Sequence, residues 1–401
     1  MDTKRGISRN VFALGWVSLF NDISSEMLYP ILPIFLTATL KVPVTVLGLI
    51  EGVAESTASI LKAFSGWFSD RIQRRKPLLV AGYSCSAFSK FLLVLACSWP
   101  LVFFARFVDR FGKGIRTSAR DALIAESTSA ETRGKAFGLH RGLDTLGAVL
   151  GPLITILLLK SVNDNLRIIF YIAVIPAVIG ILLLILFVRD KKIEGDKTGF
   201  SLKFLWRECS PSFKGFLFVS FIFGLGNSSD AFLILRAKGL GLTTSLVVFA
   251  YILFNLGYAF FSLPAGIVAD RIGPRKVLLG GFFLFALVYL AFGLVRQTCY
   301  LWFLFPLYGV YMALTEGVGK AYISNLVPQE RLGTMMGFYQ TAVGVSVLFA
   351  SLLAGLLWSH IGAGAPFIYG SVMALSAGLL FAGVKHEIPL NPPFAKGEKG
   401  D

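Results

Sequence analysis

The sequence is poor in charge, in cysteine and in histidine. Only 15% of its 401 residues are Asp, Glu, Lys or Arg, whereas about a quarter are charged in soluble globular proteins. Its four cysteines and three histidines show no metal-ligand spacing and no arrangement typical of a nucleophile with its base. No glycine-rich phosphate loop follows a strand. These shortages argue against a soluble enzyme, and we expect no metal, no cofactor and no catalytic residues.

Apolar residues, in contrast, make up 55% of the chain and come in long runs. The run IIFYIAVIPAVIGILLLILFV (168–188) carries no charge and is about 20 residues long, enough to cross a bilayer as a helix. We predict an all-α membrane protein with twelve transmembrane helices. The predicted spans are 11–37, 44–68, 77–97, 100–126, 136–160, 166–188, 213–236, 244–269, 277–296, 299–326, 334–358 and 364–384.

Basic residues outside these spans are unevenly distributed. With both termini in the cytoplasm, the inner segments hold 23 Lys and Arg and the outer segments hold 6, while the other nine of the 38 fall inside spans. The positive-inside rule requires such an asymmetry, so the net charge of +15 reports topology and not nucleic-acid binding. We predict a multi-pass plasma-membrane protein with cytoplasmic termini, and the compact chain favours a bacterial inner membrane.

A polar interval at 189–214 divides the twelve spans into six and six. At an offset of 200 residues, GWFSDRIQRRK (66–76) matches GIVADRIGPRK (266–276), and a weaker echo pairs NDISSE (21–26) with NSSD (227–230). Duplicated halves are typical of transporters whose site lies at the repeat interface. The predicted divisions are an N-terminal six-helix bundle (1–188), a cytoplasmic linker (189–212), a C-terminal six-helix bundle (213–384) and a disordered cytoplasmic tail (385–401).

The repeated loop resembles the signature G-x-x-x-D-R-x-G-R-R of the major facilitator superfamily, with Gln73 and Pro274 as local departures. The resemblance covers essentially the whole chain and implies two pseudo-symmetric six-helix bundles around a cavity that opens to each side in turn. Asp70 needs a partner such as Arg75, because an anion is unfavourable at the C-terminal end of a helix. The alternative is that the loops only anchor the chain. The predicted conformational latch consists of Gly66, Asp70, Arg71, Arg75, Gly266, Asp270, Arg271 and Arg275.

Two further stretches resemble family patterns. In span one, Pro30 and Pro33 resemble the P-x-x-P ending of twelve-span drug exporters. In span five, the spacing G-x8-G-x3-G-P of a motif associated with antiporters is reproduced by Gly138, Gly147, Gly151 and Pro152. Glycine and proline let helices approach closely or bend, so these residues are expected to serve helix packing. The resemblance implies an exporter that works by exchange.

Eighteen charged residues fall inside the predicted spans away from their ends, nine basic and nine acidic, and fifteen of them lie in the N-terminal half. Each costs at least ~2.5 kcal/mol at bilayer depth unless it is paired or faces water. We expect many of them to line a shared cavity. The set from the first half is Asp22, Glu26, Glu51, Glu55, Arg106, Asp109, Arg110, Lys113, Arg116, Arg141 and Asp144. The set that completes the site from the second half is Asn227, Asp230, Asn255, Glu316 and Lys320.

Spans one and two each carry two carboxylates four residues apart, and span four carries a basic stripe. Arg106 resembles the span-four arginine of the family motif R-F-x-x-G-x-G, which is linked to proton transfer. Our hypothesis is that Asp22 and Glu26 form a proton-titratable network with Arg106 and Arg110, because a conformational change that breaks such a pair releases or takes up a proton. The alternative is a static lattice of ion pairs that holds the N-terminal half together.

These features predict a secondary active transporter that moves a small organic solute by alternating access. The first expectation is proton-coupled efflux of a hydrophobic or drug-like compound. The basic stripe of span four leaves an organic anion or metabolite open as the alternative substrate, and uptake as the alternative direction. A non-transporting membrane sensor or enzyme is a remote alternative. The expected partners are the lipid bilayer, a small-molecule substrate and protons, without nucleic acid, and the chain is expected to be monomeric.

Overall fold

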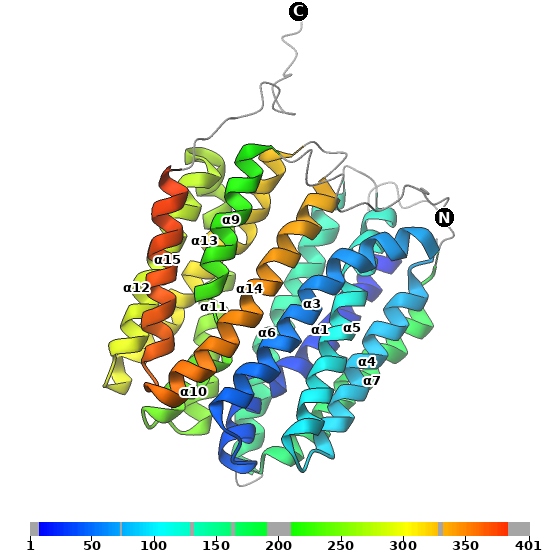
Figure 1. Cartoon of the computed structure of the whole chain (residues 1–401). Helices are drawn as coiled ribbons and strands as arrows, with labels where there is room; N and C mark the ends of the chain where they lie inside the picture. The colour runs from blue at the N-terminus through cyan, green and yellow to red at the C-terminus, as the bar shows by residue number, and fades with distance from the viewer. Residues whose placement is uncertain are drawn as a thin grey trace, which may run out of the picture.

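The computed structural model describes residues 8–72, 74–128, 132–161, 165–190, 210–327 and 332–383, with the side chains of 66–72, 133–134, 332 and 334 excepted. These residues form helices and no strands. The predicted linker and tail lie almost wholly outside the described residues. The predicted all-α, twelve-helix architecture is confirmed (Figure 1).

Six spans precede residue 191 and six follow residue 209. The first six consist of α1 (Arg9–Leu28), α2 (Leu32–Ile34), the π-helix η1 (Phe35–Thr39), α3 (Val44–Ile72), α4 (Lys76–Val94), α5 (Trp99–Glu126), α6 (Arg133–Ser161) and α7 (Leu166–Phe187). The second six consist of α9 (Pro211–Gly226), α10 (Ala231–Gly239), α11 (Thr244–Ile272), α12 (Pro274–Leu294), the 3-10 helix η2 (Thr298–Tyr300), α13 (Leu301–Leu326), α14 (Leu332–His360) and α15 (Ala365–Gly383).

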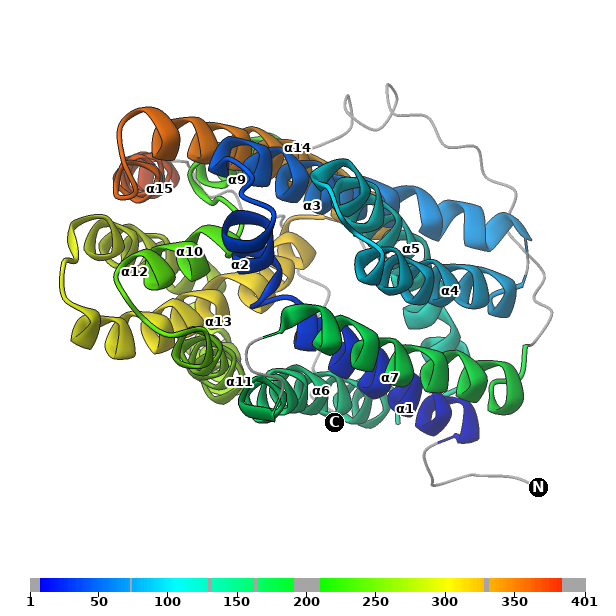
Figure 2. The same cartoon turned by 90° about the horizontal axis from the view of Figure 1, so that it is seen from below.

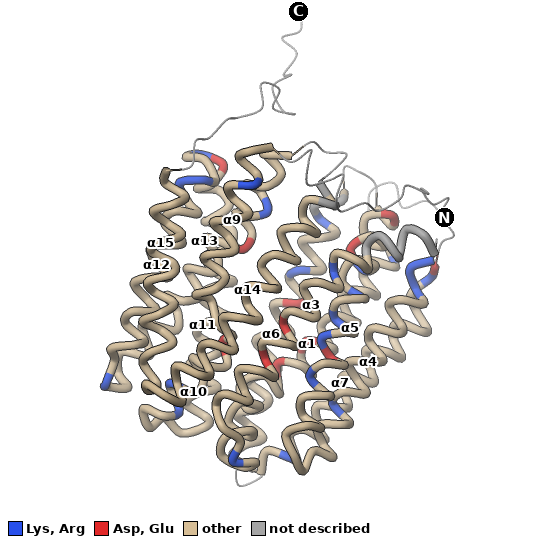
Figure 3. Tube along the Cα trace, in the orientation of Figure 1, with Lys and Arg blue, Asp and Glu red and all other residues tan. Residues whose placement is uncertain are grey.

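Ten of the helical spans are long and apolar enough to cross a membrane. The two that fall short are α1 and α5, and both carry charged residues in their interior. Large apolar side chains point outward along many helices, as at Leu186 (72% exposed) and Phe260 (76% exposed), which is expected of a surface that faces lipid. Figure 3 shows that the charged positions inside helices gather in the N-terminal half.

Spans one and seven are interrupted, which the sequence analysis did not predict. The first interruption separates α1 from α2 at 29–31, where Pro30 lacks the amide hydrogen that a continuous helix needs. The second separates α9 from α10 at 227–230. The two breaks lie about 200 residues apart in the sequence, which is the offset between the repeated loops. The weak sequence similarity between NDISSE and NSSD therefore does not correspond to equivalent positions in the structure. NDISSE lies inside α1, whereas NSSD forms the break itself.

The two halves meet along two pairs of helices, α3 with α14 and α6 with α11. We call the side where α1 begins and α15 ends the terminal side, and it lies at the top of Figure 1. On the opposite side, seen face-on in Figure 2, the short helices α2 and α10 that follow the two breaks contact each other. The breaks thus bring segments of both halves together at one end of the molecule.

Candidate functional site

A cavity of about 910 Å³ lies between the two halves. Its lining runs from the break at 227–230 towards the terminal side, where it includes Asp121 near the end of α5 and Asp270 near the end of α11. At its other end, the rings of Tyr29 and Tyr251 line the cavity and lie 5.5 Å apart, one from each half. The cavity therefore extends towards the terminal side and is closed on the opposite side.

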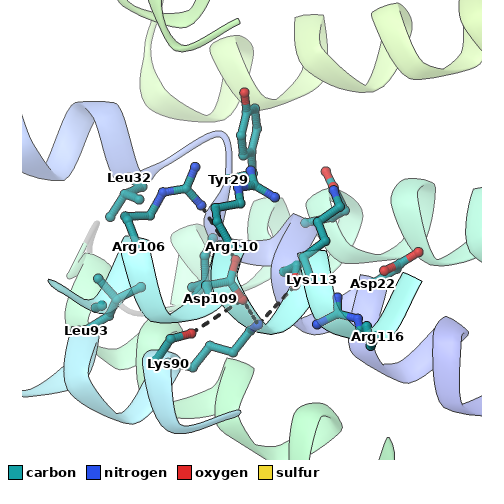
Figure 4. Close-up of a pocket in the computed structure, with 15 residues that line it drawn as sticks. Asp22, Tyr29, Leu32, Lys90, Leu93, Arg106, Asp109, Arg110, Lys113 and Arg116 are labelled. Carbon is teal, nitrogen blue, oxygen red and sulfur yellow. Dashed lines mark hydrogen bonds and ion pairs between the residues drawn. The ribbon is translucent and has the colours of Figure 1, made fainter. Parts of the chain in front are cut away.

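The structure places thirteen of the sixteen predicted cavity residues along this lining. They are Asp22, Glu26, Glu55, Arg110, Lys113, Arg116, Arg141, Asp144, Asn227, Asp230, Asn255, Glu316 and Lys320. The other three, Glu51, Arg106 and Asp109, are buried beside it. Arg106 and Asp109 line a recess of about 50 Å³ inside the N-terminal half (Figure 4).

Two of the four arginines of α5 form ion pairs with the carboxylates of α3. Arg106 donates from Nε and Nη2 to the two oxygens of Glu51 at 2.9 and 2.7 Å, and Nη2 of Arg110 lies 2.7 Å from Oε1 of Glu55. The hypothesis of ion pairs between these arginines and the carboxylates of α1 is thus corrected. The reason is helix packing: α5 packs along α3, whereas α1 packs mainly against α6 and α7.

A second group of charged residues is held within the N-terminal half, where α4 meets α5. The Lys90 ammonium, 2% exposed, lies 3.2 Å from Asp109 and donates to Ser25 at 3.0 Å. Arg116 donates to Ser86 and lies over the ring of Tyr83, 4.6 Å from its centroid. These contacts resemble the expected static lattice, because they join helices of one half, with Lys90 paired to a carboxylate and Arg116 held by neutral groups.

Five carboxylates on the lining form no ion pair with any described residue, namely Asp22, Glu26, Asp230, Asp270 and Glu316. Glu26 accepts a hydrogen bond from Tyr251 at 2.8 Å, and Asp230 accepts one from Tyr308 at 2.7 Å. Asp22 accepts only from its neighbour Asn21, at 3.2 Å. A carboxylate that is bonded to neutral groups and open to a cavity can hold either a proton or a charge.

A second chain of hydrogen bonds crosses between the halves nearer the terminal side. Arg141 of α6 donates to the Tyr258 hydroxyl at 2.8 Å, and that hydroxyl donates to Glu316 of α13 at 2.6 Å. The sequence analysis missed both tyrosines that link the halves, Tyr251 and Tyr258. A signal was present, because with Asn255 they form a polar stripe of spacing i, i+4 and i+7 on an otherwise apolar helix.

The glycines of α6 bring this helix against α1 at the two cavity carboxylates. A β-carbon at Gly147 would lie 2.9 Å from Cβ of Asp22, and one at Gly151 would lie 2.7 Å from the carbonyl oxygen of Ile23. Close approach thus requires glycine at both positions. Gly138 has open space around it and needs no such role. Pro152 lies within α6, one residue beyond the contact.

The repeated loops are only partly covered, since the side chains of Gly66, Asp70 and Arg71 lie outside the described residues. In the first loop, Arg75 is buried and lies 2.9 Å from Glu126 at the end of α5. In the second loop, Arg275 donates to the carbonyl oxygen of Phe381 at 2.9 Å, close to the end of α15. Each loop arginine therefore binds the C-terminal end of another helix in its own half, where a cation is favourable.

The second loop also shows why the signature contains a glycine. Gly273 ends α11 with φ of +93°, a conformation that residues with a β-carbon rarely adopt. Pro274 then begins α12, where a missing amide hydrogen is not costly. Asp270 and Arg271 are exposed, and Asp270 lines the mouth of the cavity.

Two repeated halves of six helical spans around a cavity closed on one side define a transporter of the alternating-access class. The chain belongs to the major facilitator superfamily, whose family model matches residues 14–253 and 216–400. This confirms the resemblance drawn from the repeated loop, and the chain is a multi-span membrane transporter.

Two relatives and one solved structure show how far the similarity extends. The chain is 39% identical to an uncharacterised MFS-type transporter of Methanocaldococcus jannaschii, over 94% of this chain and 96% of that one. It is 26% identical to a probable 4-methylmuconolactone transporter of Cupriavidus pinatubonensis, over 78% and 76% of the two chains. The crystal structure of an aspartate-to-alanine mutant of the nucleoside transporter NupG is similar with a TM-score of 0.77 at 13% identity, covering 93% of this chain and 98% of that one.

Proposed function

We propose that this protein is a proton-coupled transporter that exports a small polar organic solute by alternating access. The observation that carries the proposal is the environment of Glu26. Its carboxylate lines the cavity, forms no ion pair with a described residue, and accepts a hydrogen bond from Tyr251 of the other half.

This arrangement supports coupling between proton binding and conformation. Opening on the opposite side separates α1 from α11, which breaks the bond between Glu26 and Tyr251. The affinity of the carboxylate for a proton then differs between the two states, because hydrogen bonding and burial set that affinity. Proton binding at Glu26 in turn biases the conformational equilibrium, since any ligand with different affinity for two states shifts their populations.

The lining favours a polar solute over the hydrophobic compound expected first. Charged and hydroxyl-bearing side chains from both halves dominate it, and its larger apolar residues are few, chiefly Phe137, Phe254 and Met312. The alternative of a charged organic solute thus receives the better support. Export by exchange is supported by the glycines of α6, which belong to the antiporter-like pattern and pack against α1 beside Asp22 and Glu26.

The test is proton flux across sealed proteoliposomes that contain the full chain and an internal pH-sensitive dye. Under an imposed pH gradient, we expect solute-dependent proton movement when neutral, cationic and anionic organic solutes are screened. Glu26→Gln should abolish it, while Glu26→Asp, which keeps a titratable carboxylate, should retain part of it. Proton-coupled flux that survives Glu26→Gln combined with Asp22→Asn and Asp230→Asn would contradict the proposal.

We further propose that the terminal side faces the cytoplasm of a plasma membrane and that the chain acts as a monomer. The distribution of 23 and 6 basic residues supports this orientation. In a variant without native cysteines, Lys41→Cys on the opposite side should react with an impermeant maleimide in intact cells. Arg271→Cys on the terminal side should react only after lysis, and the reverse pattern would overturn the orientation.

Mass photometry in detergent reports the oligomeric state.

A further inference from the structure

Three lysines face the cavity from three different helices. Lys62 comes from α3, Lys113 from α5 and Lys320 from α13, so that two belong to the N-terminal half and one to the C-terminal half. Lys62 and Lys113 are half-buried, and Lys320 is exposed to the cavity. All three line the same cavity, and the Lys62 ammonium lies within electrostatic reach of those of Lys113 and Lys320 as well as of the Glu55 and Glu316 carboxylates. The three therefore form one cationic cluster, which we call the lysine cluster.

No described carboxylate forms an ion pair with the lysine cluster, and no described group accepts a hydrogen bond from its ammonium groups. The two acids that interact electrostatically with Lys62, which are Glu55 and Glu316, are bound to other partners. Glu55 lies 2.7 Å from Arg110, and Glu316 accepts a hydrogen bond from Tyr258 at 2.6 Å. The lysine cluster thus carries positive charge that the protein itself compensates only at a distance.

This situation differs from that of the arginines on α5. Arg106 and Arg110 form short ion pairs within the N-terminal half, so they are neutralised before any solute arrives. Three like charges around a cavity inside a membrane protein repel one another, and their repulsion is stronger there than in bulk water. An anion placed among them removes this repulsion and gains charge-assisted hydrogen bonds.

We propose that the lysine cluster is the substrate site and that it binds an organic anion with at least two negative charges. An ammonium group is a compact charge with three rotatable donors, so it accepts carboxylate or phosphate oxygens without a fixed geometry. A dicarboxylate and a phosphate ester therefore share the required chemistry. This inference rests on the transport function proposed above and names the substrate class for it.

One member of the lysine cluster, Lys320, lies away from the carboxylates that we propose bind protons, whereas Lys113 lines the same recess as Asp22 and Glu26. Glu26 and Asp230 lie where the cavity is closed, beside the two helix breaks, whereas Lys320 lies two turns from the terminal-side end of α13. An anion held by Lys62 and Lys113 on one side and by Lys320 on the other joins the two halves. Such bridging favours closure of the terminal side around the anion, because binding stabilises the state that makes more contacts.

The test is isothermal titration of the purified full chain in detergent with solutes of graded charge. One series is succinate, succinamate and succinamide, and the other is glycerol 3-phosphate and glycerol. We expect binding in at least one series, with the doubly charged member bound at least tenfold more tightly than the neutral one. The series that binds distinguishes a carboxylate from a phosphate group.

Substitutions then locate the site. Lys62→Gln, Lys113→Gln and Lys320→Gln should each weaken anion binding about tenfold or more, whereas Lys113→Arg should retain most of it. Lys160→Gln is the matched control, because Lys160 is exposed at the opposite-side end of α6 and outside the cavity. Gel filtration and the thermal unfolding midpoint check that each variant folds.

Three results would overturn the inference: preference for the neutral members, no binding of either dianion, or dianion binding that the three substitutions leave unchanged. Failure of the proposed function looks different. Lysine-dependent anion binding without proton-coupled flux in proteoliposomes would leave the lysine cluster in place and reject proton-coupled transport. Proton-coupled flux of neutral or cationic solutes that the lysine substitutions do not alter would retain transport and reject the anion site.

Discussion

Tyr251 of α11 donates its hydroxyl hydrogen to Glu26 of α1 across 2.8 Å, and this bond joins the two halves where the cavity ends. Tyr251 is 5% exposed, and its ring lies 5.5 Å from that of Tyr29. This hydrogen bond therefore involves a titratable carboxylate, joins the two halves and lies at the closed end of the cavity. Its removal should affect conformation as well as proton binding.

We expect Tyr251→Phe to favour opening on the opposite side. A hydrogen bond to a charged group contributes about 1.5–3 kcal/mol, so its loss should raise the share of the open state about tenfold or more. The measurement is the distance distribution between spin labels at Lys41→Cys and Arg296→Cys, which are exposed on the opposite side, one in each half. The distribution should gain a longer component.

Tyr308→Phe is the matched control for this experiment. It removes an equally short bond from tyrosine to carboxylate, to Asp230 at 2.7 Å, but both residues belong to the C-terminal half. The distances between the labels should stay unchanged. Equal effects of the two substitutions would mean that the bond between halves does not set the closed state.

Tyr258→Phe should instead favour separation of the two halves on the terminal side. Its hydroxyl links Arg141 of the N-terminal half to Glu316 of the C-terminal half, on the part of the cavity nearer the terminal side. Without this link, the helices α6 and α11 should separate more readily at that side. Spin labels at Lys135→Cys and Lys276→Cys, both exposed there, should report longer distances, while the Lys41 and Arg296 pair should not. A lengthening confined to the opposite side would refute this account.

Most of the helical spans could be predicted from the sequence, because ten of the twelve are runs of apolar residues that no neighbouring chain segment needs to define. The helix breaks could not. Pro30 alone is compatible with a continuous, kinked helix, and the break at 227–230 is stabilised by contacts from distant segments. Ser229, for example, donates through its backbone to Ser351 of α14 at 3.2 Å.

The charged residues of the site were recognisable from their cost in a membrane, but their partners were not. Arg106 can pair with Glu26 or with Glu51 as far as sequence spacing is concerned. The choice depends on whether α1 or α3 packs along α5, and helical periodicity carries no information about that. Tyr251 and Tyr258 were missed for a related reason, since tyrosine is common at membrane interfaces and draws attention only once a partner is seen.

Gly151→Ala should destabilise the protein by about 1–3 kcal/mol, because the added methyl group overpacks a close helix contact. Its β-carbon would lie 2.7 Å from the carbonyl oxygen of Ile23 and 2.9 Å from Cβ of Glu26. Gly138→Ala on the same helix is the control, since its β-carbon would meet nothing within 4 Å, and it should leave stability equal or slightly raised. Thermal unfolding in detergent compares them, and equal midpoints would disprove the packing role of Gly151.

The ion pair between Glu51 and Arg106 can be tested for a purely structural role or for a role in the conformational change. Glu51 is 1% exposed and Arg106 is 6% exposed, and they share two hydrogen bonds. Arg106→Gln leaves a buried carboxylate without a charged partner, so it should cost about 3–5 kcal/mol of stability. Glu51→Gln with Arg106→Gln removes both charges and should cost clearly less than the sum of the two single variants.

The double variant also separates the two roles. Ser229 of the C-terminal half donates to Glu51 at 3.4 Å, so the pair touches the second helix break and not only its own half. If the pair is part of a static lattice, the double variant should recover stability and transport together. If the pair takes part in the conformational change, stability should recover while solute-driven proton flux stays low. Unfolding midpoints and flux measured on the same preparations decide between these outcomes.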